Sequence, residues 1–564
     1  MRASPTLSKK LGQPALPLEE AEAKAIQSQK AFEDAPNDVN RTTAQRDNAA
    51  LILATNMEVE YWKQKSQIRW LDKGDSNTKL FQAFAKGKRK KLQISHIIDG
   101  NGNGLHSMDE IKQEAIRHFQ NQFQAPKTPN PNLESTLPYI CSLVSTEDNL
   151  MLTALPSLAA VNETVWDFDP NSASGPDGFN GIFFRTCWDL IQQDVLTASQ
   201  EFFLGLPIPK GYDSTIITLI PKKDPKRLDD YRLISLSTFI SKINTKLLAN
   251  RLKKLLPKII SPEQGAFQKG KSIDDHILLA QEAIHGLDRK VFGGNLIIKI
   301  DMEKAFDSMN WNFLEGILRA FGFSQAAINL LMTNLRNTLI SMLINGEPQG
   351  FSAMSRGVKQ GDPLSPLLFI IWFEAFSRLL NNSMDRNTIK RFNMGIVKMP
   401  SHLIYADNLM VFTKGDILNL LKLNNILKVY KQASGQQINL SNSRFYTPKS
   451  ISTDQQARMA KALSMNCGSL PFTYLGATLR RGILKKVDCN GLLSHVYKHL
   501  SSWYSRTLNQ MGRLILIKHV LSSIPLHLIA VQSLPRSIIR TLHSLMANFL
   551  WGQKDGRAKY HRRN

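Results

Sequence analysis

Three segments of this 564-residue chain hold the residue types that metal-dependent phosphoryl transfer uses. In LIIKIDMEKAFD, Asp301 ends an apolar run and Asp307 follows six residues later. In HLIYADNLMVF, Asp407 and Asn408 separate two apolar stretches, and in GVKQGDPLSP a Gly/Pro turn carries Gln360. A carboxylate at the end of a strand can meet another in a tight turn between strands, and the two can share divalent metal ions. Two-metal phosphoryl transfer requires this arrangement.

Each acid also has an ordinary structural interpretation. An Asp that closes a strand is more often a turn former or a helix cap than a metal ligand. The same holds for Asp362, which shares the Gly/Pro turn with Gln360. Spacing alone leaves both interpretations open, and the ordered set of segments together with the charge of the chain favours the metal site.

The segments around these residues predict the elements that must position them. Short apolar runs that are typical of strands cover residues 214–220, 295–300 and 401–413, the last folded as a hairpin, and predicted helices cover residues 240–260, 364–380 and 503–524. Strands and helices mix without a regular βαβ period. The pattern therefore predicts an α+β fold rather than a doubly wound sheet.

The charge of the chain favours a polyanionic partner. Lys and Arg number 71 against 47 Asp and Glu, a formal net charge of +24, and nucleic acid is the commonest partner of such a protein. The last 85 residues, 480–564, hold 15 Lys and Arg against only Asp488 and Asp555. This segment predicts a basic helical domain that holds a nucleic-acid backbone.

Composition excludes several classes of protein. With 42% hydrophobic and 21% charged residues, the chain is neither wholly disordered nor fibrous. Its four cysteines form no CxxC pair, which argues against zinc modules and a disulfide framework and fits a reducing compartment. The N-terminus has no apolar core typical of a secretory signal, and the apolar run Leu367–Phe373 is far shorter than the about 18–20 residues of a membrane span. We therefore expect an intracellular protein without a membrane partner.

The N-terminal part has its own organisation. Residues 1–50 are polar and predict a loose or partly helical lead-in, and residues 51–85 show helical periodicity. The basic run KGKRKK (86–91) is interpreted either as a solvated face or linker, or as a nuclear-targeting or phosphate-contacting segment. Three prolines in residues 125–137 predict a linker.

Ten segments, in order along the chain, resemble the reverse transcriptases of non-LTR retrotransposons, the long-interspersed-element (LINE) class, and most closely those of plants. They are QKSQIRWLDKGDSNTKLF (64–81), SGPDGFNGIFF (174–184), ITLIPKKDPKRLDDYRLISL (217–236), EQGAFQKGKSIDDHILLAQE (263–282), KIDMEKAFDSMNW (299–311), GVKQGDPLSPLLF (357–369), HLIYADNLMVF (402–412), SGQQINLSNSRF (434–445), LPFTYLGATL (470–479) and GRLILIKHVLSSIP (512–525). The resemblance implies an RNA-directed DNA polymerase, a nucleotidyltransferase with the right-hand fold of fingers, palm and helical thumb. It transfers a nucleotide from a dNTP to a primer 3′-hydroxyl on an RNA template.

The resemblance also assigns roles to individual residues. Asp301 is the first catalytic carboxylate, binding both of two expected Mg²⁺ ions, and Asp407 is the second. Phe306 packs beneath the incoming sugar and excludes a 2′-hydroxyl, although its plain interpretation is a core residue. Gln360 lies beside the nucleotide.

Two basic residues of the fingers segment complete the implied nucleotide site. By the resemblance, Lys222 and Arg232 contact the triphosphate, Arg through its forked donors and Lys as a point charge. Without the resemblance both pass as ordinary surface charges.

Two positions of the implied active site have lost their charge. Asn408 stands where the family has a second Asp after Tyr-Ala, so the metal site loses one anion. Asn442 stands where the family has a Lys that helps to protonate the leaving pyrophosphate. We therefore expect impaired activity, and the alternative is a catalytically inactive retroelement remnant that only binds RNA or an RNA–DNA hybrid. An intron-maturase-like protein is a third reading, against which the family segments 64–81 and 470–525 argue.

The resemblance also predicts how the chain is divided. We expect an N-terminal helical extension and linker (1–137), a pre-finger segment (138–203), the reverse transcriptase domain with fingers and palm (204–479), and a basic helical thumb (480–564). Family members usually carry an endonuclease before this region and continue beyond it, so the sequence is interpreted as a truncated, degenerate copy. Template RNA, a DNA primer and dNTPs are the expected partners, and nuclear residence is expected.

Overall fold

The computed structural model describes residues 15–66, 68, 78–124, 136–209, 211–222, 224–501, 508–551, 553–554 and 557–558. The chain divides into two compact units. The larger is formed by Ile94–Ile483, and the smaller by Met1–Gln93 together with Leu484–Asn564.

One sheet of the larger unit has the strand order β4 (Tyr231–Ser237), β3 (Ser214–Pro221), β6 (Leu339–Ile344) and β7 (Glu347–Ala353). Strand β3 pairs in parallel with β6, and the other pairs are antiparallel. Helix α5 (Met108–Phe123) packs against this sheet. Its buried residues Ile111, Ala115, Phe119 and Phe123 are spaced by four, so they form one apolar stripe.

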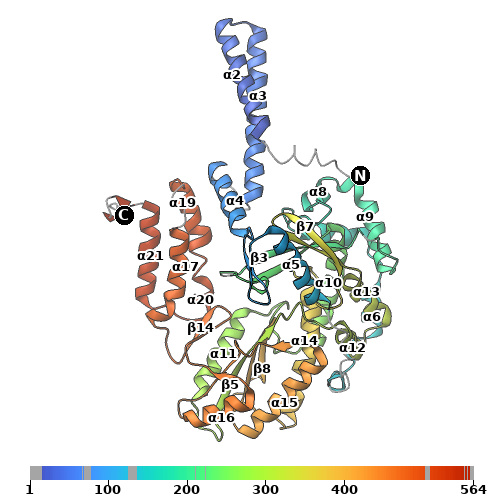
Figure 1. The fold of residues 1–564 in the computed structure, drawn as a ribbon, viewed down its shortest axis with the longest axis vertical. Helices are drawn as coiled ribbons and strands as arrows, with labels where there is room; N and C mark the ends of the chain where they lie inside the picture. The colour runs from blue at the N-terminus through green and yellow to red at the C-terminus, as the bar shows by residue number, and fades with distance from the viewer. Residues whose placement is uncertain are drawn as a thin grey trace. The chain divides into compact units, whose positions relative to one another are not determined.

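The second sheet has the order β12 (Asn466–Cys467), β11 (Arg444–Tyr446), β5 (Asn295–Glu303), β9 (Asn408–Lys414) and β8 (His402–Tyr405), and β10 (Gln437–Ile438) pairs with β5. Strand β5 is central, and Leu296, Ile297 and Ile298 are fully buried because both faces of the sheet are covered. Figure 1 shows α11 (Ile273–Leu287) on one side of β5 and β8, and α14 (Ser365–Asp385) and α15 (Ile417–Ser434) on the other.

Further helices surround the two sheets. Helix α10 (Phe239–Ile259) packs against α14 and shares its large apolar core. The remaining elements of the unit, with η marking 3-10 helices, are β1 (Ile97–Ile98), β2 (Gly104–Leu105), η2 (Leu137–Tyr139), α6 (Thr146–Thr153), α7 (Leu158–Asp167), α8 (Gly181–Thr186), α9 (Trp188–Phe203), η3 (Leu228–Asp230), α12 (Trp311–Phe321), α13 (Gln325–Arg336), α16 (Thr453–Leu463), β13 (Phe472–Tyr474) and β14 (Ala477–Leu479).

The smaller unit is helical. Its elements are α2 (Ala15–Asp34), α3 (Asp38–Ser66), α4 (Thr78–Leu92), η4 (Lys486–Cys489), α17 (Asn490–Leu500), α19 (Gln510–Leu516), the π-helical turn η5 (Ile517–Leu521), α20 (Leu526–Val531), α21 (Arg536–Trp551), β15 (Gln553–Lys554) and β16 (Arg557–Ala558). Helices α2 and α3 pack against each other along their length (Figure 1). A small apolar core joins both ends of the chain, because Leu80 and Phe81 pack with Leu508 and Leu516.

Most of the predicted elements are present. Strand β5, the β8–β9 hairpin and helices α10 and α14 confirm the predictions for residues 295–300, 401–413, 240–260 and 364–380. The mixture of helices with two largely antiparallel sheets confirms the α+β class.

The sequence left two alternatives open in the N-terminal part, and the structure decides between them. The KGKRKK run is not a linker: it lies within helix α4, where Lys and Arg are good helix formers, and it is exposed along its whole length. Among the described residues of the lead-in, Ala15–Asp34 and those from Asp38 onward are helical, which confirms a partly helical segment. The predicted linker 125–137 lies outside the described residues up to position 135. The four-part division of the chain stays a prediction.

One helical stretch of the described residues, Gln510–Val531, is long and apolar enough by length and composition to cross a membrane. It is a longer apolar stretch than Leu367–Phe373, on which the expectation of no membrane partner was based. Length and composition alone do not distinguish a membrane span from an apolar segment of a folded domain. The absence of a membrane partner therefore stays a prediction.

Candidate active site

Asp301 lies near the end of β5, at the centre of the second sheet. In the antiparallel register of β5 with β9, Asp301 is opposite Asn408. Two backbone bonds fix its position: its N–H donates to Ser443 Oγ (3.1 Å) and its carbonyl accepts from the N–H of Asn439 (2.8 Å). The backbone of Asp301 is therefore held on both sides, beside the β8–β9 turn.

Asp407 lies in the two-residue turn between β8 and β9. Tyr405 pairs with Asn408, so only Ala406 and Asp407 form the turn, and Ala406 has a left-handed backbone (φ 55°). Burial raises the pKa of Asp407, and the negative charge of Asp301 raises it further, while the positive charge of Arg232 acts in the opposite direction. The hairpin thus brings the two predicted catalytic carboxylates into electrostatic contact.

The two asparagines that replace charged residues each touch one of these carboxylates. Asn408 Nδ2 donates to Asp407 Oδ1 (3.1 Å), and Asn442 Nδ2 donates to Asp301 Oδ2 (3.1 Å). Each amide therefore occupies an oxygen of a carboxylate that the resemblance assigns to metal binding. An aspartate at 408 could not make the first of these bonds while ionised.

The donor set suits a hard divalent cation. Asp301 and Asp407 offer carboxylate oxygens, which Mg²⁺ prefers, and the repulsion that raises the pKa of Asp407 is relieved by a cation held between them. Among the described residues, no group of three or more His, Cys, Asp and Glu side chains forms a metal cluster. The residues therefore fit a metal held by two carboxylates.

Phe306 lies in the loop after β5, and Gln360 lies in the Gly/Pro turn that contacts this loop. The ring of Phe306 stacks on Phe369 with a centroid distance of 4.2 Å and an interplanar angle of 15°. Its carbonyl accepts from the N–H of Val358 (3.0 Å), and the carbonyl of Gln360 accepts from the N–H of Ser235 (2.7 Å). The Gly/Pro turn is thus bonded both to the loop after β5 and to strand β4.

The other two acids of the motifs do not join the metal pair. Asp307 is buried and accepts from Gln360 Nε2 (2.9 Å) and from Gln122 Nε2 (3.0 Å). Asp362 is buried and accepts from the N–H of Leu364 (2.9 Å) before helix α14, and burial raises its pKa. Asp362 thus forms a turn before α14, as its structural interpretation predicts, whereas Asp307 holds two distant Gln side chains rather than a turn or a helix end.

Lys222 and Arg232 are both exposed and lie at the end of the β3–β4 hairpin. Lys222 Nζ donates to the carbonyl of Asp229 (3.1 Å), and its positive charge acts on the buried Asp307. The charge of Arg232 acts on Asp407. The charge of Arg232 thus acts on one of the two predicted catalytic carboxylates, whereas the charge of Lys222 acts on Asp307, which is not one of them.

Sequence reasoning missed a buried ionic group under the Gly/Pro turn. Lys359 Nζ, fully buried, donates to Asp213 Oδ1 (3.0 Å) and Asn334 Oδ1 (2.6 Å). Asp213 also accepts from Ser241 Oγ (2.8 Å) and Thr338 Oγ1 (3.1 Å). Nothing in the sequence distinguishes Lys359 from an exposed lysine, because its partners Asp213 and Asn334 are 146 and 25 positions away.

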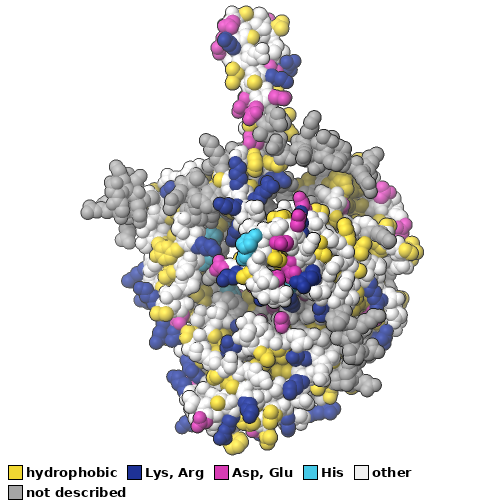
Figure 2. Space-filling view, viewed as in Figure 1, with side chains coloured by type: hydrophobic (Ala, Val, Ile, Leu, Met, Phe, Trp, Pro, Cys, Tyr) yellow, Lys and Arg dark blue, Asp and Glu magenta, His cyan; other side chains and the backbone are white. Residues whose placement is uncertain are grey.

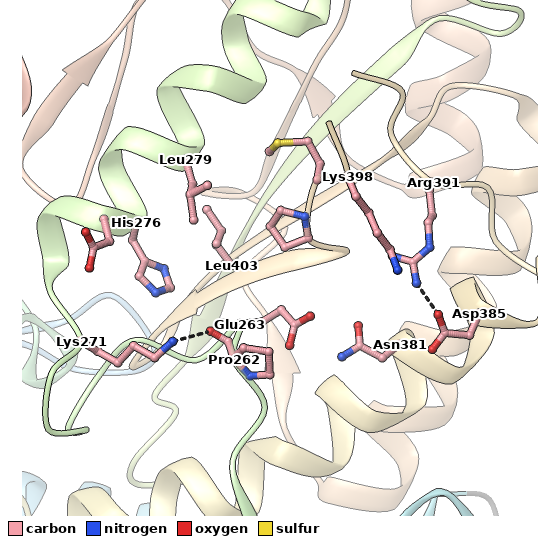
Figure 3. A pocket seen from close by; sticks show the side chains of 13 residues that line it. Pro262, Glu263, Lys271, His276, Leu279, Asn381, Asp385, Arg391, Lys398 and Leu403 are labelled. Carbon is pink, nitrogen blue, oxygen red and sulfur yellow. Dashed lines mark hydrogen bonds and ion pairs between the residues drawn. The ribbon is translucent and has the colours of Figure 1, made fainter. Parts of the chain in front are cut away.

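A separate cavity of about 470 Å³ lies beside β8 and α11 (Figure 3). It contains none of the predicted site residues. Its cationic residues Lys271, Arg391 and Lys398 are matched by the acids Glu263, Asp275 and Asp385. The cavity therefore has no excess positive charge and is not the polyanion site that the sequence predicts.

Comparison with known proteins agrees with this geometry. The family profile described as reverse transcriptase (RNA-dependent DNA polymerase) matches residues 220–479. The chain is 25% identical over 495 residues to the transposon TX1 uncharacterized 149 kDa protein of Xenopus laevis, covering 86% of this chain and 37% of that protein. It is 27% identical over 245 residues to the Pol polyprotein of the retrotransposable element R2 of Nasonia vitripennis, covering 43% and 22%. It is 24% identical over 349 residues to the RNA-directed DNA polymerase from mobile element jockey of Drosophila funebris, covering 60% and 36%.

Residues 220–479, from strand β3 through β14, thus form a reverse transcriptase domain, which by family is a nucleotidyltransferase. Its relatives include proteins of mobile elements, and the chain is similar to the reverse transcriptases of the non-LTR retrotransposon class. It spans between 22% and 37% of the length of these three relatives. The expected closeness to plant members stays a prediction.

Proposed function

We propose that the chain is an RNA-directed DNA polymerase that adds deoxynucleotides to a primer 3′-hydroxyl on an RNA template. The observation that carries the proposal is the register of β5 with β9, which sets Asp301 opposite Asn408 and Asp407 in the adjoining turn. Two carboxylates near each other at a rigid sheet suit metal-dependent nucleotidyl transfer.

The palm, fingers and thumb of the proposed right-hand polymerase fold are assigned from the residues that each part carries. The sheet that contains β5, β9 and β8 is the palm, because it carries both carboxylates. The sheet of β4, β3, β6 and β7 is the fingers, because the β3–β4 hairpin carries Lys222 and Arg232. The basic helical segment 480–564 is the thumb, and its excess charge suits the backbone of template and primer.

Asp301 and Asp407 would hold Mg²⁺, two ions by family, and the bound metal would supply the positive charge that lowers the pKa of the primer 3′-hydroxyl and neutralises the triphosphate. The hydroxyl attacks the α-phosphorus of the dNTP in line, and pyrophosphate leaves. Lys222 and Arg232 bind the triphosphate oxygens and orient the leaving group. The positive charge of Arg232 acts on Asp407, and that of Lys222 acts on the buried Asp307.

The remaining assigned residues select the nucleotide. Phe306, held by its stack on Phe369, closes the space beneath the sugar and excludes a 2′-hydroxyl. Gln360, bonded to Asp307, lies beside the nucleotide. Both side chains are supported by neighbours, which suits a role in discrimination.

We infer that Asn408 and Asn442 impair this chemistry. Each amide donates to one of the two metal-binding carboxylates, so a cation must compete with it for an oxygen, and the site has one anion fewer. If the amides prevent the cation from binding at all, the second candidate function applies, and the protein binds RNA or an RNA–DNA hybrid without extending a primer.

Primer extension decides between these two functions. On a poly(A) RNA template with a DNA primer, Mg²⁺ and dNTPs, we expect slow extension by the wild type. We expect none by Asp301→Ala, because the first metal ligand is lost, with hybrid binding nearly unchanged. Extension by a correctly folded Asp301→Ala would show that the assignment of the palm is wrong. Binding without extension by the wild type would instead establish the second function.

A further inference from the structure

Asp307 is the buried centre of a polar network around the loop after β5. It is 7% exposed, and each of its carboxylate oxygens accepts from one amide: Oδ1 from Gln360 and Oδ2 from Gln122. The segment of the Gly/Pro turn lies directly on its backbone, since a Cβ on Gly357 would lie 2.6 Å from the Asp307 carbonyl oxygen. The orientation of Asp307 therefore depends on these two amides.

Gln122 joins two parts of this network. Its Nε2 donates to Asp307 Oδ2, while its Oε1 accepts from Lys304 Nζ (3.0 Å). Lys304 in turn pairs with Asp229 (2.5 Å), whose carbonyl accepts from Lys222. The chain of contacts thus runs from Gln360 to Lys222, the two ends of the proposed nucleotide site, and Gln122 is at its middle.

The helix that carries Gln122 is firmly docked. The carbonyl of Gln122 accepts from Arg356 Nε (2.7 Å), and the carbonyl of Phe123 accepts from the N–H of Ser355 (3.0 Å). Phe119 and Phe123 are buried against the β3–β4 and β6–β7 strands. Helix α5 therefore places Gln122 on the same rigid body as the Gly/Pro turn.

We propose that Gln122, from a helix that precedes the matched domain by nearly a hundred residues, is a positioning residue of the nucleotide site. It orients the Asp307 carboxylate so that the amide of Gln360 faces the nucleotide. The proposal rests on the proposed function for its ligand, a dNTP. It predicts that residues 108–123 belong to the working polymerase.

The pH dependence of stability that comes from Asp307 provides a readout for the positioning role of Gln122. Burial raises its pKa to about 6, and the hydrogen bonds from Gln360 and Gln122 act in the opposite direction. The charged groups that face it are Lys304, Lys222 and Arg356. Because the folded-state pKa is above the ordinary value, ionisation of Asp307 costs stability as the pH rises through about 6. Loss of the Gln122 donor therefore lowers stability further only at pH values at which Asp307 is ionised.

The first test compares Gln122→Leu with Gln113→Leu, the same change at an exposed position of the same helix. In primer extension with varied dNTP, we expect Gln122→Leu to raise the KM for dNTP about tenfold, the effect of one hydrogen bond to a charged group. We expect kcat to change by less than about twofold, much less than the tenfold change in KM. An unchanged KM, or a fall in kcat alone, would overturn the proposal.

The second test does not need activity. We expect the melting temperature of Gln122→Leu to fall about 2 °C further below the wild type at pH 8.0 than at pH 5.0, while Gln113→Leu shows no such difference. An equal loss at both pH values indicates packing alone and overturns the proposal. Should the wild type not extend primers, the proposed function fails, and the melting comparison still decides whether Gln122 holds Asp307.

Discussion

The two carboxylates that we propose to bind metal, Asp301 and Asp407, are each in contact with a neutral amide. The amide of Asn408 donates to Asp407, and the amide of Asn442 donates to Asp301. An amide donor stabilises an ionised carboxylate without a metal, so it lowers the advantage that a cation gains by binding there. The scarcity of negative charge at this site is therefore a property of single residues rather than of the fold.

Asn408→Asp restores one anion and removes the amide that occupies Asp407. We expect the rate of primer extension to rise about tenfold, as for other single charge changes at a reacting centre, and the Mg²⁺ concentration for half-maximal rate to fall. A Mg²⁺ titration of extension measures both. Asn387→Asp, the same change at an exposed position, is the control. If Asn408→Asp keeps the wild-type rate and Mg²⁺ dependence, the missing anion is not the limiting defect.

At the scale of elements, a buried ion pair between Lys359 and Asp213 anchors the Gly/Pro turn. Lys359 and Asp213 are both almost completely buried, and together they connect the turn to the start of strand β3. A buried charge that loses its partner is costly, because the remaining ion has neither water nor a counter-charge. The turn that carries Gln360 thus depends on a group that makes no contact with substrate.

Lys359→Met removes the cation and leaves Asp213 uncompensated. We expect a loss of about 3–5 kcal/mol in the free energy of unfolding, measured by urea denaturation. Lys398→Met, at an exposed site, should change it by less than about 0.5 kcal/mol. Adding Asp213→Asn to Lys359→Met should recover part of the loss, since a neutral amide needs no counter-charge. A loss no greater than that of the control contradicts a stabilising role for the pair.

The elements explain which features could be predicted from the sequence. Two apolar runs separated by Ala406 and Asp407 predict a tight hairpin, and the apolar residues before Asp301 predict the central strand, so both strands follow from local pattern. The roles of Asp301 and Asp407 as a catalytic pair come from the resemblance, because spacing alone left their structural interpretation open. The roles of Gln122 and Lys359 could not be predicted. Gln122 bonds to a residue 185 positions away, and a polar side chain on a helix carries no periodic signal that distinguishes an inward contact from solvent.

At the scale of the whole molecule, the net charge of +24 favours a polyanionic partner such as the proposed nucleic acid. In the smaller unit, helix α4 carries an exposed basic run, and Figure 2 shows Lys and Arg side chains gathered where this helix lies. Lys86, Arg89 and Lys90 are three and four positions apart, so they share one face of the helix. This arrangement favours phosphate contact among the interpretations of the KGKRKK run.

Replacing Lys86, Arg89 and Lys90 by Ala keeps the helix and removes three positive charges from that face. If all three contact phosphates, the slope of log K against log salt for an RNA–DNA hybrid should become shallower by about 2, because each lost contact removes about 0.7–0.9. Hybrid binding measured at several salt concentrations gives the slope. The matched variant replaces the exposed Lys24, Lys30 and Arg41 of α2 and α3, with the same loss of charge. An equal change of slope in both variants would mean that α4 contributes only long-range charge, whereas a change confined to the α4 variant assigns the phosphate contacts to this helix.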